Sequence, residues 1–400
     1  MYQLLGNLAL VEVSSFIASP TIGLYCAQFG AEVIRVDQIG GGQDFHRWPV
    51  NARGDSFSWE NLNRAKRSVA LDLTRPEGRE LLLALCAEVG TLATNLPAKG
   101  FLAHEKLEVR RADMISVRVM GWPDGAIALD YTANAAVGWP ALTGPDERPV
   151  NHALPAWDFI AGAYGAFALL AAVQRRAATG LGGEVRLPLT DIAMGTTANL
   201  GRVAEVLHTG HDREGIGNAV FGSIGRDFVT ADGVRTMIVA INERQWQGLV
   251  RALALEADVA RIEAERKVVL AGSDSNRFTN RDLVFAAIER AVGALTHQAL
   301  TQRLDAEGVT HGQYRTLPEA LEDARLFTAN PMFSPCADNP SGFAYPAAGA
   351  FATIPQLERQ PAAPAPRNGQ HTEQVLADHL KLSSGEIARL IDSGIAGIAR

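Results

Sequence analysis

Short β-rich runs alternate with helical patterns through the first half of the chain, and this alternation restricts the fold more than any other feature. The predicted strands are Leu8–Ser14, Glu32–Asp37, Ser68–Leu73, Thr91–Asn95, Met114–Met120 and Glu184–Leu189. The predicted helices are Thr21–Phe29, one from Thr74 to Leu85, Ala103–Arg111, Ala156–Arg176 and one ending near His208. Such alternation builds a mostly parallel sheet with helices on both faces, so we predict an α/β fold.

The helix that opens at Thr74 carries its own start signal. Thr74-Arg-Pro-Glu77 has the spacing of a capping box with proline in the first turn. We therefore expect the side chains of Thr74 and Glu77 to cap this helix.

The pattern changes near residue 210, and a smaller α+β domain is predicted over residues 225–325. Runs of β-forming residues flank Asp232-Gly233, which is a tight-hairpin signal. Helical patterns follow at Glu243–Leu253, Arg281–Val292 and His297–Ala306. Further along, Pro355–Asn368 holds four prolines and has no clear period, which indicates an extended strap. Two short helices are predicted after it, the second capped by Ser383 and Glu386.

Length and composition limit the class of protein. At 400 residues the chain is too long for one hydrophobic core, so two domains are expected. A net charge of -7 gives no general attraction to nucleic acid or to an anionic membrane. Cys26, Cys86 and Cys336 are far apart in sequence, which predicts free buried thiols rather than disulfides or a zinc site.

The chain shows no membrane or export signal that we recognise. The apolar stretch Phe159–Val173 is shorter than the ~20 residues that cross a bilayer. The first residues, Met1–Val11, lack the charged start and cleavage site of a signal peptide. We therefore expect a cytoplasmic protein.

A run of three glycines, Gly40-Gly41-Gly42, follows the second predicted strand. A dinucleotide fingerprint needs its glycines in the first strand–helix turn, and here that turn, Ser14 to Pro20, has none. NAD, FAD and ATP are therefore not expected, and the glycines are read as a flexible turn. Close by, Asp44 and Arg47 either pair to brace the loop or leave Arg47 to face a carboxylate or phosphate.

Arg64, Lys66 and Arg67 form the densest basic cluster of the chain. Clusters at strand ends are usually solvated faces. The alternative is a phosphate site, because guanidinium and ammonium groups supply the charge that an acidic protein otherwise lacks.

Asp158 lies near the start of an apolar helix rich in small residues, with no cation within four positions. Pro155 suits a first helical turn, which places Asp158 at the positive end of the helix dipole. Trp157 and Phe159 would exclude water from its surroundings, and a poorly solvated ionised carboxylate is a competent nucleophile. The simpler alternative is an ordinary aspartate in the first turn of a helix.

Four glycines gather between Gly215 and Gly225, including Gly217 and Gly222, in a short stretch with no charged residue between Gly215 and Gly225. This composition fits a mobile lid over a cleft and fits a plain interdomain linker equally well. Spacings typical of metal ligands, of a Ser nucleophile elbow or of a Cys–His site do not occur.

Together these motifs resemble the family III CoA-transferases, the group that contains formyl-CoA transferase, carnitine CoA-transferase and α-methylacyl-CoA racemase. The resemblance covers essentially the whole chain. Its markers are Phe29-Gly-Ala-Glu-Val-Ile-Arg-Val-Asp37, Gly42-x-Asp44-x-x-Arg47, Asn63-x-x-Lys66-Arg67-Ser68-x-x-Leu71-Asp72, Asn95, Asp158 and Ala365-Pro-Arg-x-Gly-x-His371-Thr372.

The resemblance implies a large CoA-binding domain with a Rossmann-like sheet, residues 1–215 and 330–400, which the C-terminal segment rejoins after the small domain. It also implies an interlocked homodimer. Asp158 falls at the family's catalytic aspartate, and Lys66, Arg67, Asn95 and Gln38 fall near positions that hold the nucleotide end of CoA. An acyl-CoA substrate is implied, with no cofactor beyond coenzyme A itself and no metal.

Two residues of this chain differ from the family pattern, and they limit which of the family's activities is expected. Ile17 stands where formyl-CoA transferase has a glutamine, and Leu129 stands where racemases have a histidine before Asp130. Without that histidine, proton transfer at an α-carbon lacks one of its two bases, which disfavours a racemase.

Several longer stretches of this sequence resemble those of the family members that move CoA between the two carboxylates of mesaconyl-CoA. They are Ile39-Gly-Gly-Gly42, Arg47-Trp48-Pro49, Asn151-His152-x-Leu154-Pro155-Ala156-Trp157-Asp158 and Gly217-Asn218 through Gly225-Arg226-Asp227-Phe228. The resemblance thus implies intramolecular transfer through an aspartyl-CoA intermediate. An intermolecular CoA-transferase, a racemase and a non-catalytic CoA-binding protein remain alternatives. Candidates for contact with the substrate are Arg47, His46, His152, Gly217 and Gly222.

Overall fold

The computed structural model of the chain describes residues 1–144 and 148–399, which fall into two units. The first unit is formed by Met1–Gly138, His152–His211 and Ala329–Arg400, and the second by Trp139–Asn151 and Asp212–Thr328. The predicted large domain, residues 1–215 and 330–400, includes Trp139–Asn151, which the structure places in the second unit. This segment groups with the second unit because Gly215 lies against it: a Cβ at Gly215 would lie 2.7 Å from the carbonyl oxygen of Gly144.

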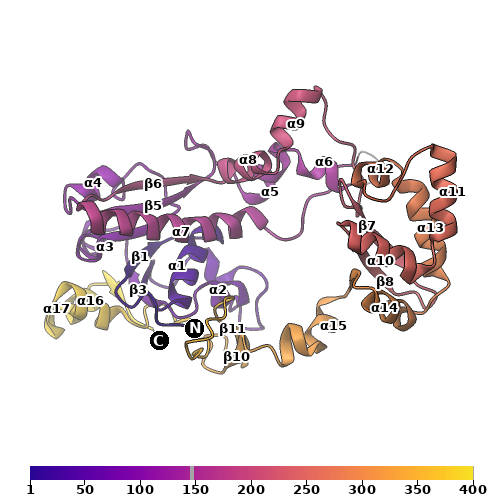
Figure 1. Cartoon of the computed structure of the whole chain (residues 1–400). Helices are drawn as coiled ribbons and strands as arrows, with labels where there is room; N and C mark the ends of the chain where they lie inside the picture. Colours follow the sequence, from indigo (N-terminus) through magenta and orange to yellow (C-terminus); the bar gives the residue numbers. More distant parts are fainter. Residues whose placement is uncertain (145–147, 400) are drawn as a thin grey trace. The chain divides into compact units, whose positions relative to one another are not determined.

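A seven-stranded sheet forms the centre of the first unit, in the order β12-β3-β2-β1-β4-β5-β6 (Figure 1). Its strands are β1 (Ala9–Val13), β2 (Glu32–Asp37), β3 (Arg67–Leu71), β4 (Thr91–Thr94), β5 (Ile115–Met120), β6 (Gly183–Pro188) and β12 (Ala396–Gly397). All neighbours pair in parallel except β12, which runs antiparallel to β3. The predicted α/β fold with a mostly parallel sheet is confirmed.

Helices cover both faces of this sheet, as its fully buried strands require. Leucine and valine side chains of β1, β2 and β3 pack with α3 (Pro76–Val89), α4 (His104–Glu108), α16 (Thr372–Leu380) and α17 (Ser384–Asp392) in one apolar cluster. Alternate residues of β1 and β2 point to the opposite face, where α1 (Ala18–Gln28) and α7 (Ala156–Thr179) lie side by side.

Two glycines allow α7 to approach α1 closely. A Cβ at Gly162 would overlap Thr21, and one at Gly165 would lie 2.6 Å from Ile22. Both glycines therefore face a neighbouring helix. Because α7 starts beside α1 and the carboxyl ends of the strands, this packing also sets the position of its first turn.

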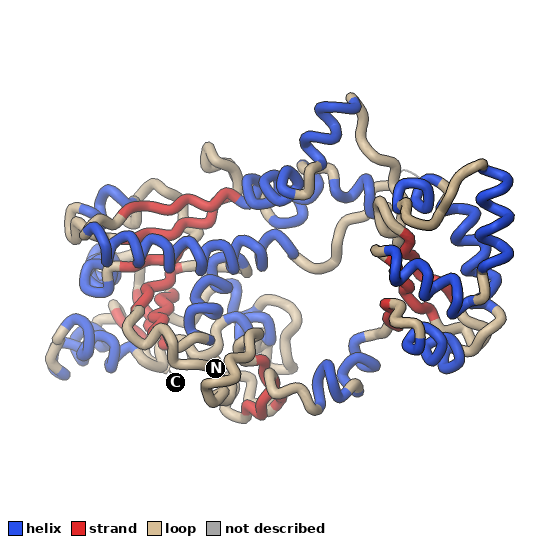
Figure 2. The backbone as a smooth tube through the Cα atoms, in the orientation of Figure 1, coloured by secondary structure: helices blue, strands red, loops and turns tan. Residues whose placement is uncertain are grey.

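The rest of the first unit consists of short helices, one hairpin and the strap. The helices are η1 (Gln43–His46), α2 (Phe57–Leu62), α5 (Asp130–Ala136), α8 (Leu189–Asn199) and α9 (Arg202–Thr209), and the hairpin is β10 (Phe333–Cys336) with β11 (Tyr345–Ala348). The predicted strap runs without helix or strand from Gly349 to His371 (Figure 2). It is tied down by backbone hydrogen bonds such as Ala65 N–H to Pro364 O, at 3.0 Å.

The second unit is an α+β structure around the antiparallel sheet β7-β8-β9, as predicted. Its elements are β7 (Ile224–Val229), β8 (Arg235–Ala240), β9 (Thr310–Gln313), α6 (Trp139–Thr143), α10 (Glu243–Leu253), α11 (Glu256–Arg266), α12 (Asp274–Thr279), α13 (Arg281–Gly293), α14 (His297–Ala306), α15 (Leu317–Glu322) and η2 (Ala324–Thr328). Phe228, Trp246 and Phe285 are among the buried side chains of its own core.

Two sequence-based expectations about helices are wrong. Helix α3 begins at Pro76 with Arg75 as its N-cap and no side-chain cap, because the Thr74 hydroxyl donates instead to Asp72 at 2.6 Å. Helix α7 has 24 residues, so its apolar stretch is not too short for a bilayer; by length and composition alone it passes that test. In this chain, one side of α7 packs along α1 and β5.

Candidate active site

Asp158 lies in the first turn of α7, as the sequence predicts. Pro155 is the N-cap residue and offers no side-chain cap. The helix start is therefore stabilised by groups from elsewhere in the fold.

Burial, and after it the negative charge of Asp130, raise the pKa of Asp158 to about 7, although the Arg47 guanidinium partly opposes them. The predicted dry environment is thus present. Burial therefore disfavours the ionised form of this carboxyl. Near neutral pH the site holds a carboxylate whose charged form is poorly solvated and hence reactive.

The sequence did not indicate α5, whose first residue completes the start of α7. The backbone N–H of Asp158 donates to Asp130 Oδ2 at 3.0 Å. The other oxygen of Asp130 contacts His152 Nε2 at 2.6 Å. Trp157 Nε1 donates to Asn134 Oδ1 at 3.1 Å, so α5 holds both the loop before α7 and its first turn.

The loop after β2 also reaches the site. Asp44 accepts a hydrogen bond from the Phe16 backbone at 2.9 Å, and Phe16 has a positive φ of 65°. A bulky residue in this region is strained, and such strain is often held at functional sites. Arg47 lies over the Phe16 ring at 5.2 Å. Asp44 therefore braces the loop through Phe16 and through Arg35 at 3.7 Å, and not through the ion pair with Arg47 that was one of the two expectations.

Arg47 is exposed, and within residues 1–144 and 148–399 its guanidinium makes no hydrogen bond or ion pair. Its charge acts on Asp158. A cation without a carboxylate partner beside a dry nucleophile suits an anionic group of a substrate.

A cavity of about 580 Å³ opens at the carboxyl ends of the central strands. Its lining includes Ser14 and Ser15 after β1, Gln38 after β2, and the cation of Arg79. The sheet order reverses between β1 and β4, and ligands of open α/β sheets bind at such a switch point. Asn95 lies at the same edge, where its side chain holds Ser15.

The predicted contact of Lys66 with CoA is wrong on this geometry. Lys66 is fully buried, and its ammonium donates to both oxygens of Glu12, to Asn63 Oδ1 and to Pro20 O at 2.8–2.9 Å. Burial lowers its pKa to about 8. Arg67 begins β3 and so lies at the amino ends of the parallel strands, away from the cavity. There it pairs with Glu32 and with Asp378 at 3.0 Å. Arg64 is also buried and bonds Ala348 O.

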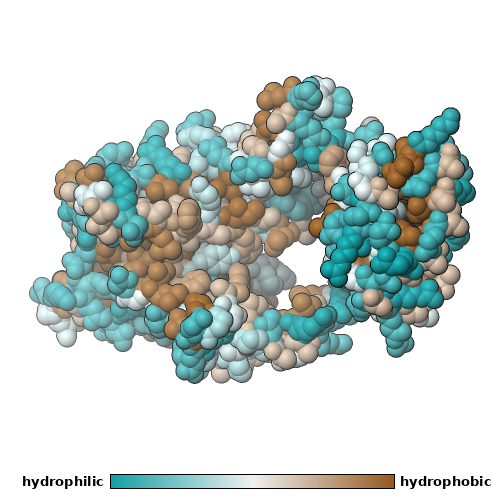
Figure 3. Space-filling view, viewed as in Figure 1, coloured by the Kyte–Doolittle hydropathy of each residue, from teal (hydrophilic) through white to brown (hydrophobic). Residues whose placement is uncertain are grey.

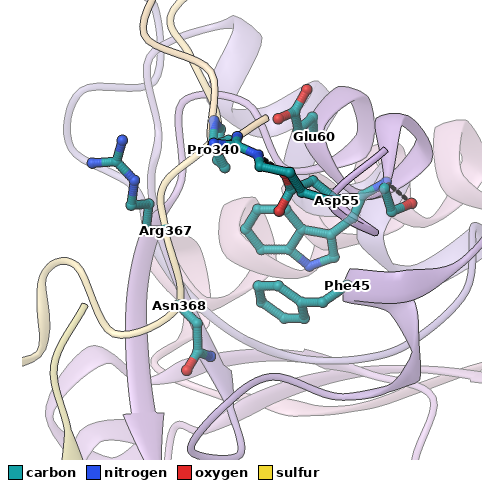
Figure 4. Close-up of a pocket in the computed structure, with 9 residues that line it drawn as sticks. Phe45, Asp55, Glu60, Pro340, Arg367 and Asn368 are labelled. Carbon is teal, nitrogen blue, oxygen red and sulfur yellow. Dashed lines mark hydrogen bonds and ion pairs between the residues drawn. The ribbon is translucent and has the colours of Figure 1, made fainter. Parts of the chain in front are cut away.

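A second cavity, of about 530 Å³, lies between the loop that contains Phe45 and the C-terminal strap (Figure 4). Figure 4 shows Arg367 and Asn368 on the strap side and the ring of Phe45 below Asp55 on the other. Glu60 in its wall is already bound by Ser341 and Tyr345. Asp158 does not line this cavity.

The remaining candidates are dispersed. His46 Nδ1 contacts Gly54 O at 3.2 Å, and His152 is bound to Asp130. Gly217 and Gly222 both belong to the second unit and have positive φ, and Gly217 lines a cavity there with Asn218 and Asp227. Their role at the substrate stays a prediction. Among the described residues, no group of three or more His, Cys, Asp or Glu side chains is placed to hold a metal ion.

Comparison with known proteins agrees with this arrangement. The family model described as CoA-transferase family III matches residues 5–372. The chain is 40% identical to 2-methylfumaryl-CoA isomerase of Chloroflexus aurantiacus, over 99% of this chain and 98% of that protein. It is 25% identical to succinyl-CoA–D-citramalate CoA-transferase of the same organism, over 96% of each chain.

Solved structures share the fold. A CAIB/BAIF family protein from Brucella suis superposes with a TM-score of 0.77 at 24% identity, covering 94% of this chain and 100% of that one. A hypothetical protein from Mycobacterium tuberculosis gives a TM-score of 0.75 at 22% identity, with 94% and 99% covered.

The raised pKa of Asp158 predicts a stability effect with a definite sign. Between its ordinary value of 3.8 and about 7, the folded protein keeps a proton that the unfolded chain has lost, so stability falls as pH rises through this window. Asp158→Asn removes the buried charge. We expect its free energy of unfolding to exceed that of the wild type by about 2 kcal/mol near pH 8, with the difference vanishing near pH 4.

Urea unfolding across this pH range measures the effect. Asp191→Asn is the matched control, because Asp191 lies in the first turn of α8 but is exposed. It should lose only the small dipole interaction and gain no stability. A pH-independent difference for Asp158→Asn, or a destabilisation near pH 8, would contradict the burial argument.

Proposed function

The chain belongs to CoA-transferase family III, and from this premise we propose that it moves coenzyme A between the two carboxylates of mesaconyl-CoA within one molecule. The observation that carries the proposal is the 40% identity, over 99% of the chain, to 2-methylfumaryl-CoA isomerase. The desolvated Asp158 at the start of α7 supplies a nucleophile that fits this chemistry.

In the first half of the reaction, Asp158 attacks the thioester carbonyl of the substrate. The C–S bond breaks, CoA leaves as the thiolate, and Asp158 and the acyl group form a mixed anhydride. The thiolate then attacks the Asp158 carbonyl of this anhydride, which leaves an aspartyl-CoA thioester and free mesaconate. No proton is consumed, and each step exchanges one acyl derivative for another of similar energy.

In the second half, mesaconate presents its other carboxylate to the aspartyl thioester. The same two steps run in reverse, and CoA returns to the opposite end of the molecule while Asp158 is regenerated. Mesaconate must stay bound between the halves. Arg47, a cation without an ion pair in the described part of the chain, suits the substrate carboxylate that is not reacting.

For the nucleotide end of CoA, we propose the cavity at the carboxyl ends of β1, β2 and β3. Its walls combine apolar residues with Gln38, with the carboxylates of Asp37 and Asp72, and with Arg79, whose guanidinium also lies 5.4 Å from the Phe101 ring. Asn95 would act by holding Ser15 at the rim. A cytoplasmic location, where CoA and reduced thiols are found, belongs to the same proposal.

Intramolecular transfer predicts isomerisation without exchange. Incubation with a single C1 or C4 isomer of mesaconyl-CoA should give the other isomer, and free isotope-labelled mesaconate should not enter the product. Chromatography with mass detection follows both. Rapid entry of label would instead support an intermolecular CoA-transferase. Tight CoA binding without turnover on any dicarboxyl-CoA ester would support a non-catalytic binding protein, and loss of the α-proton of a 2-methylacyl-CoA would support a racemase.

A covalent intermediate predicts modification at one residue. Hydroxylamine or borohydride added during turnover should modify Asp158, and peptide mapping by mass spectrometry should locate the change there. Asp158→Asn should abolish both labelling and transfer, whereas Asp191→Asn should keep both. Label on a different carboxylate would refute the assignment of Asp158.

We also propose that two chains form an interlocked homodimer. The outward face of α7 exposes large apolar side chains: Ile160 (38%), Tyr164 (53%), Phe167 (66%) and Leu170 (37%). Brown, hydrophobic residues gather on the face of the first unit that Figure 3 shows. A contiguous apolar face of this kind marks an interface.

The dimer proposal predicts the mass of the protein in solution. Light scattering should give twice the chain mass of 42.8 kDa. Phe167→Asp should weaken the dimer, and Val109→Asp, at an isolated exposed position, should not; a monomeric wild type would overturn the proposal.

A further inference from the structure

Asp130 stands between two groups that both bear on Asp158. One oxygen accepts the backbone N–H of Asp158 at 3.0 Å, and the other contacts the Nε2 of His152 at 2.6 Å. Asp130 is 2% exposed, so it has little access to solvent. Both of its oxygens are therefore committed to the loop and helix that carry the nucleophile.

The first of these contacts is a helix cap supplied from another element. The first N–H groups of a helix have no partner within it, and Pro155 provides no side-chain cap for α7. The carboxylate of Asp130, at the start of α5, fills this role for Asp158 itself. The backbone of the nucleophile is thereby fixed relative to α5.

The second contact controls charge. The two carboxylates repel each other, so the charge of Asp130 favours the protonated form of Asp158. A protonated His152 beside Asp130 makes the pair neutral, whereas a neutral imidazole leaves its negative charge uncompensated. The proton on His152 thus changes the field at Asp158 without touching it.

We propose that Asp130 and His152 are a positioning pair for the nucleophile: Asp130 holds the backbone of Asp158, and the proton of His152 sets the negative charge that Asp158 faces. The inference rests on the proposed function and extends it, because it names the two residues that would regulate the charge of Asp158 during the reaction. Neither residue needs to contact the acyl group. A histidine at position 152 also restores, from a different segment, an imidazole beside Asp130 that Leu129 does not supply.

Within residues 1–144 and 148–399, other charged groups near Asp158 form no equivalent pair. Arg47 lowers the pKa of Asp158 but is always charged in the relevant range. Elements packed against α7 carry the remaining titratable side chains, namely Tyr25 and Cys26 on α1, Tyr131 on α5, Arg118 on β5, Glu184 and Arg186 on β6 and Asp191 on α8. Glu184 is paired with both arginines, and burial raises the pKa of Cys26 to about 12.

Two isosteric variants test the pair because they should act in opposite directions. Asp130→Asn can still accept the N–H of Asp158 and donate to His152, but it removes the negative charge. We expect the titration midpoint of Asp158 to fall by about one pH unit. His152→Gln keeps a hydrogen bond to Asp130 but cannot carry a proton. We expect the midpoint to rise by a similar shift of about one unit.

The measurement should follow Asp158 without turnover. Carbodiimide labels protonated carboxyl groups, so the pH dependence of labelling at Asp158, mapped by mass spectrometry, reports its titration directly. The acid limb of kcat/KM for mesaconyl-CoA isomerisation is the second readout, and it should move with the labelling curve. His379→Gln is the matched control, because His379 forms a comparable contact with Glu32, at 3.3 Å, at the opposite edge of the sheet. It should leave both curves unchanged.

The outcomes separate this inference from the proposed function. Opposite shifts in labelling support the pair even if mesaconyl-CoA is not a substrate, in which case only the proposed reaction fails. Unchanged midpoints in both variants, or shifts in the same direction, overturn the inference whatever the activity. If Asp130→Asn does not fold, His152→Gln still tests the inference, because it keeps the hydrogen bond from the Asp158 backbone to Asp130. A titration midpoint of Asp158 that does not rise in His152→Gln would then refute the proposed role of the His152 proton.

Discussion

A buried carboxylate, Glu12, holds together the charged interior on which the first unit depends. Lys66 donates to both of its oxygens at 2.9 Å, and Arg35 donates to one of them at 3.0 Å, with all three side chains at most 1% exposed. Buried charges persist only when they are paired in this way, and removal of one partner strands the others. Gly23 of α1 lies directly above, where a Cβ would overlap Glu12. The helix can therefore cover the cluster only because this residue is glycine.

From this cluster, a series of contacts extends to the reactive edge of the sheet. Arg35 donates to Ser14 O at the end of β1 and to Asp37 at the end of β2, both at 2.9 Å, and so fixes two carboxyl ends together. It lies 3.7 Å from Asp44, which holds the strained backbone of Phe16. The ring of Phe16 in turn supports Arg47. The position of the cation at the proposed substrate site thus depends on charges buried beneath α1.

The sequence could predict what depends on local pattern. β2 and α10 begin and end at the predicted residues, and the capping box of Ser383 and Glu386 forms as predicted. Contacts between distant segments could not be read in this way. A basic residue beside a strand has the same local pattern whether it faces solvent, a phosphate or a buried glutamate, so the pattern at Lys66 gave no sign of Glu12.

The partner of Asp130 lies 22 residues away and joins it only through the fold. Leu129 showed that one imidazole was absent from the position before Asp130, but periodicity gave no sign that His152 would supply another. The same limit explains why α5 was missed. Its 7 residues have no long apolar period, and its start is marked only by the Thr132 hydroxyl, which accepts from the Leu129 backbone at 2.9 Å.

The partners of the buried carboxylates in this unit distinguish structural residues from the reactive one. Glu12 is neutralised by two cations, and Asp130 is satisfied by a backbone N–H and an imidazole. Among the described residues, the carboxylate of Asp158 has no such partner, and burial together with the charge of Asp130 raises its pKa to about 7. A carboxylate that folding does not stabilise is the one whose charge remains available for bond formation.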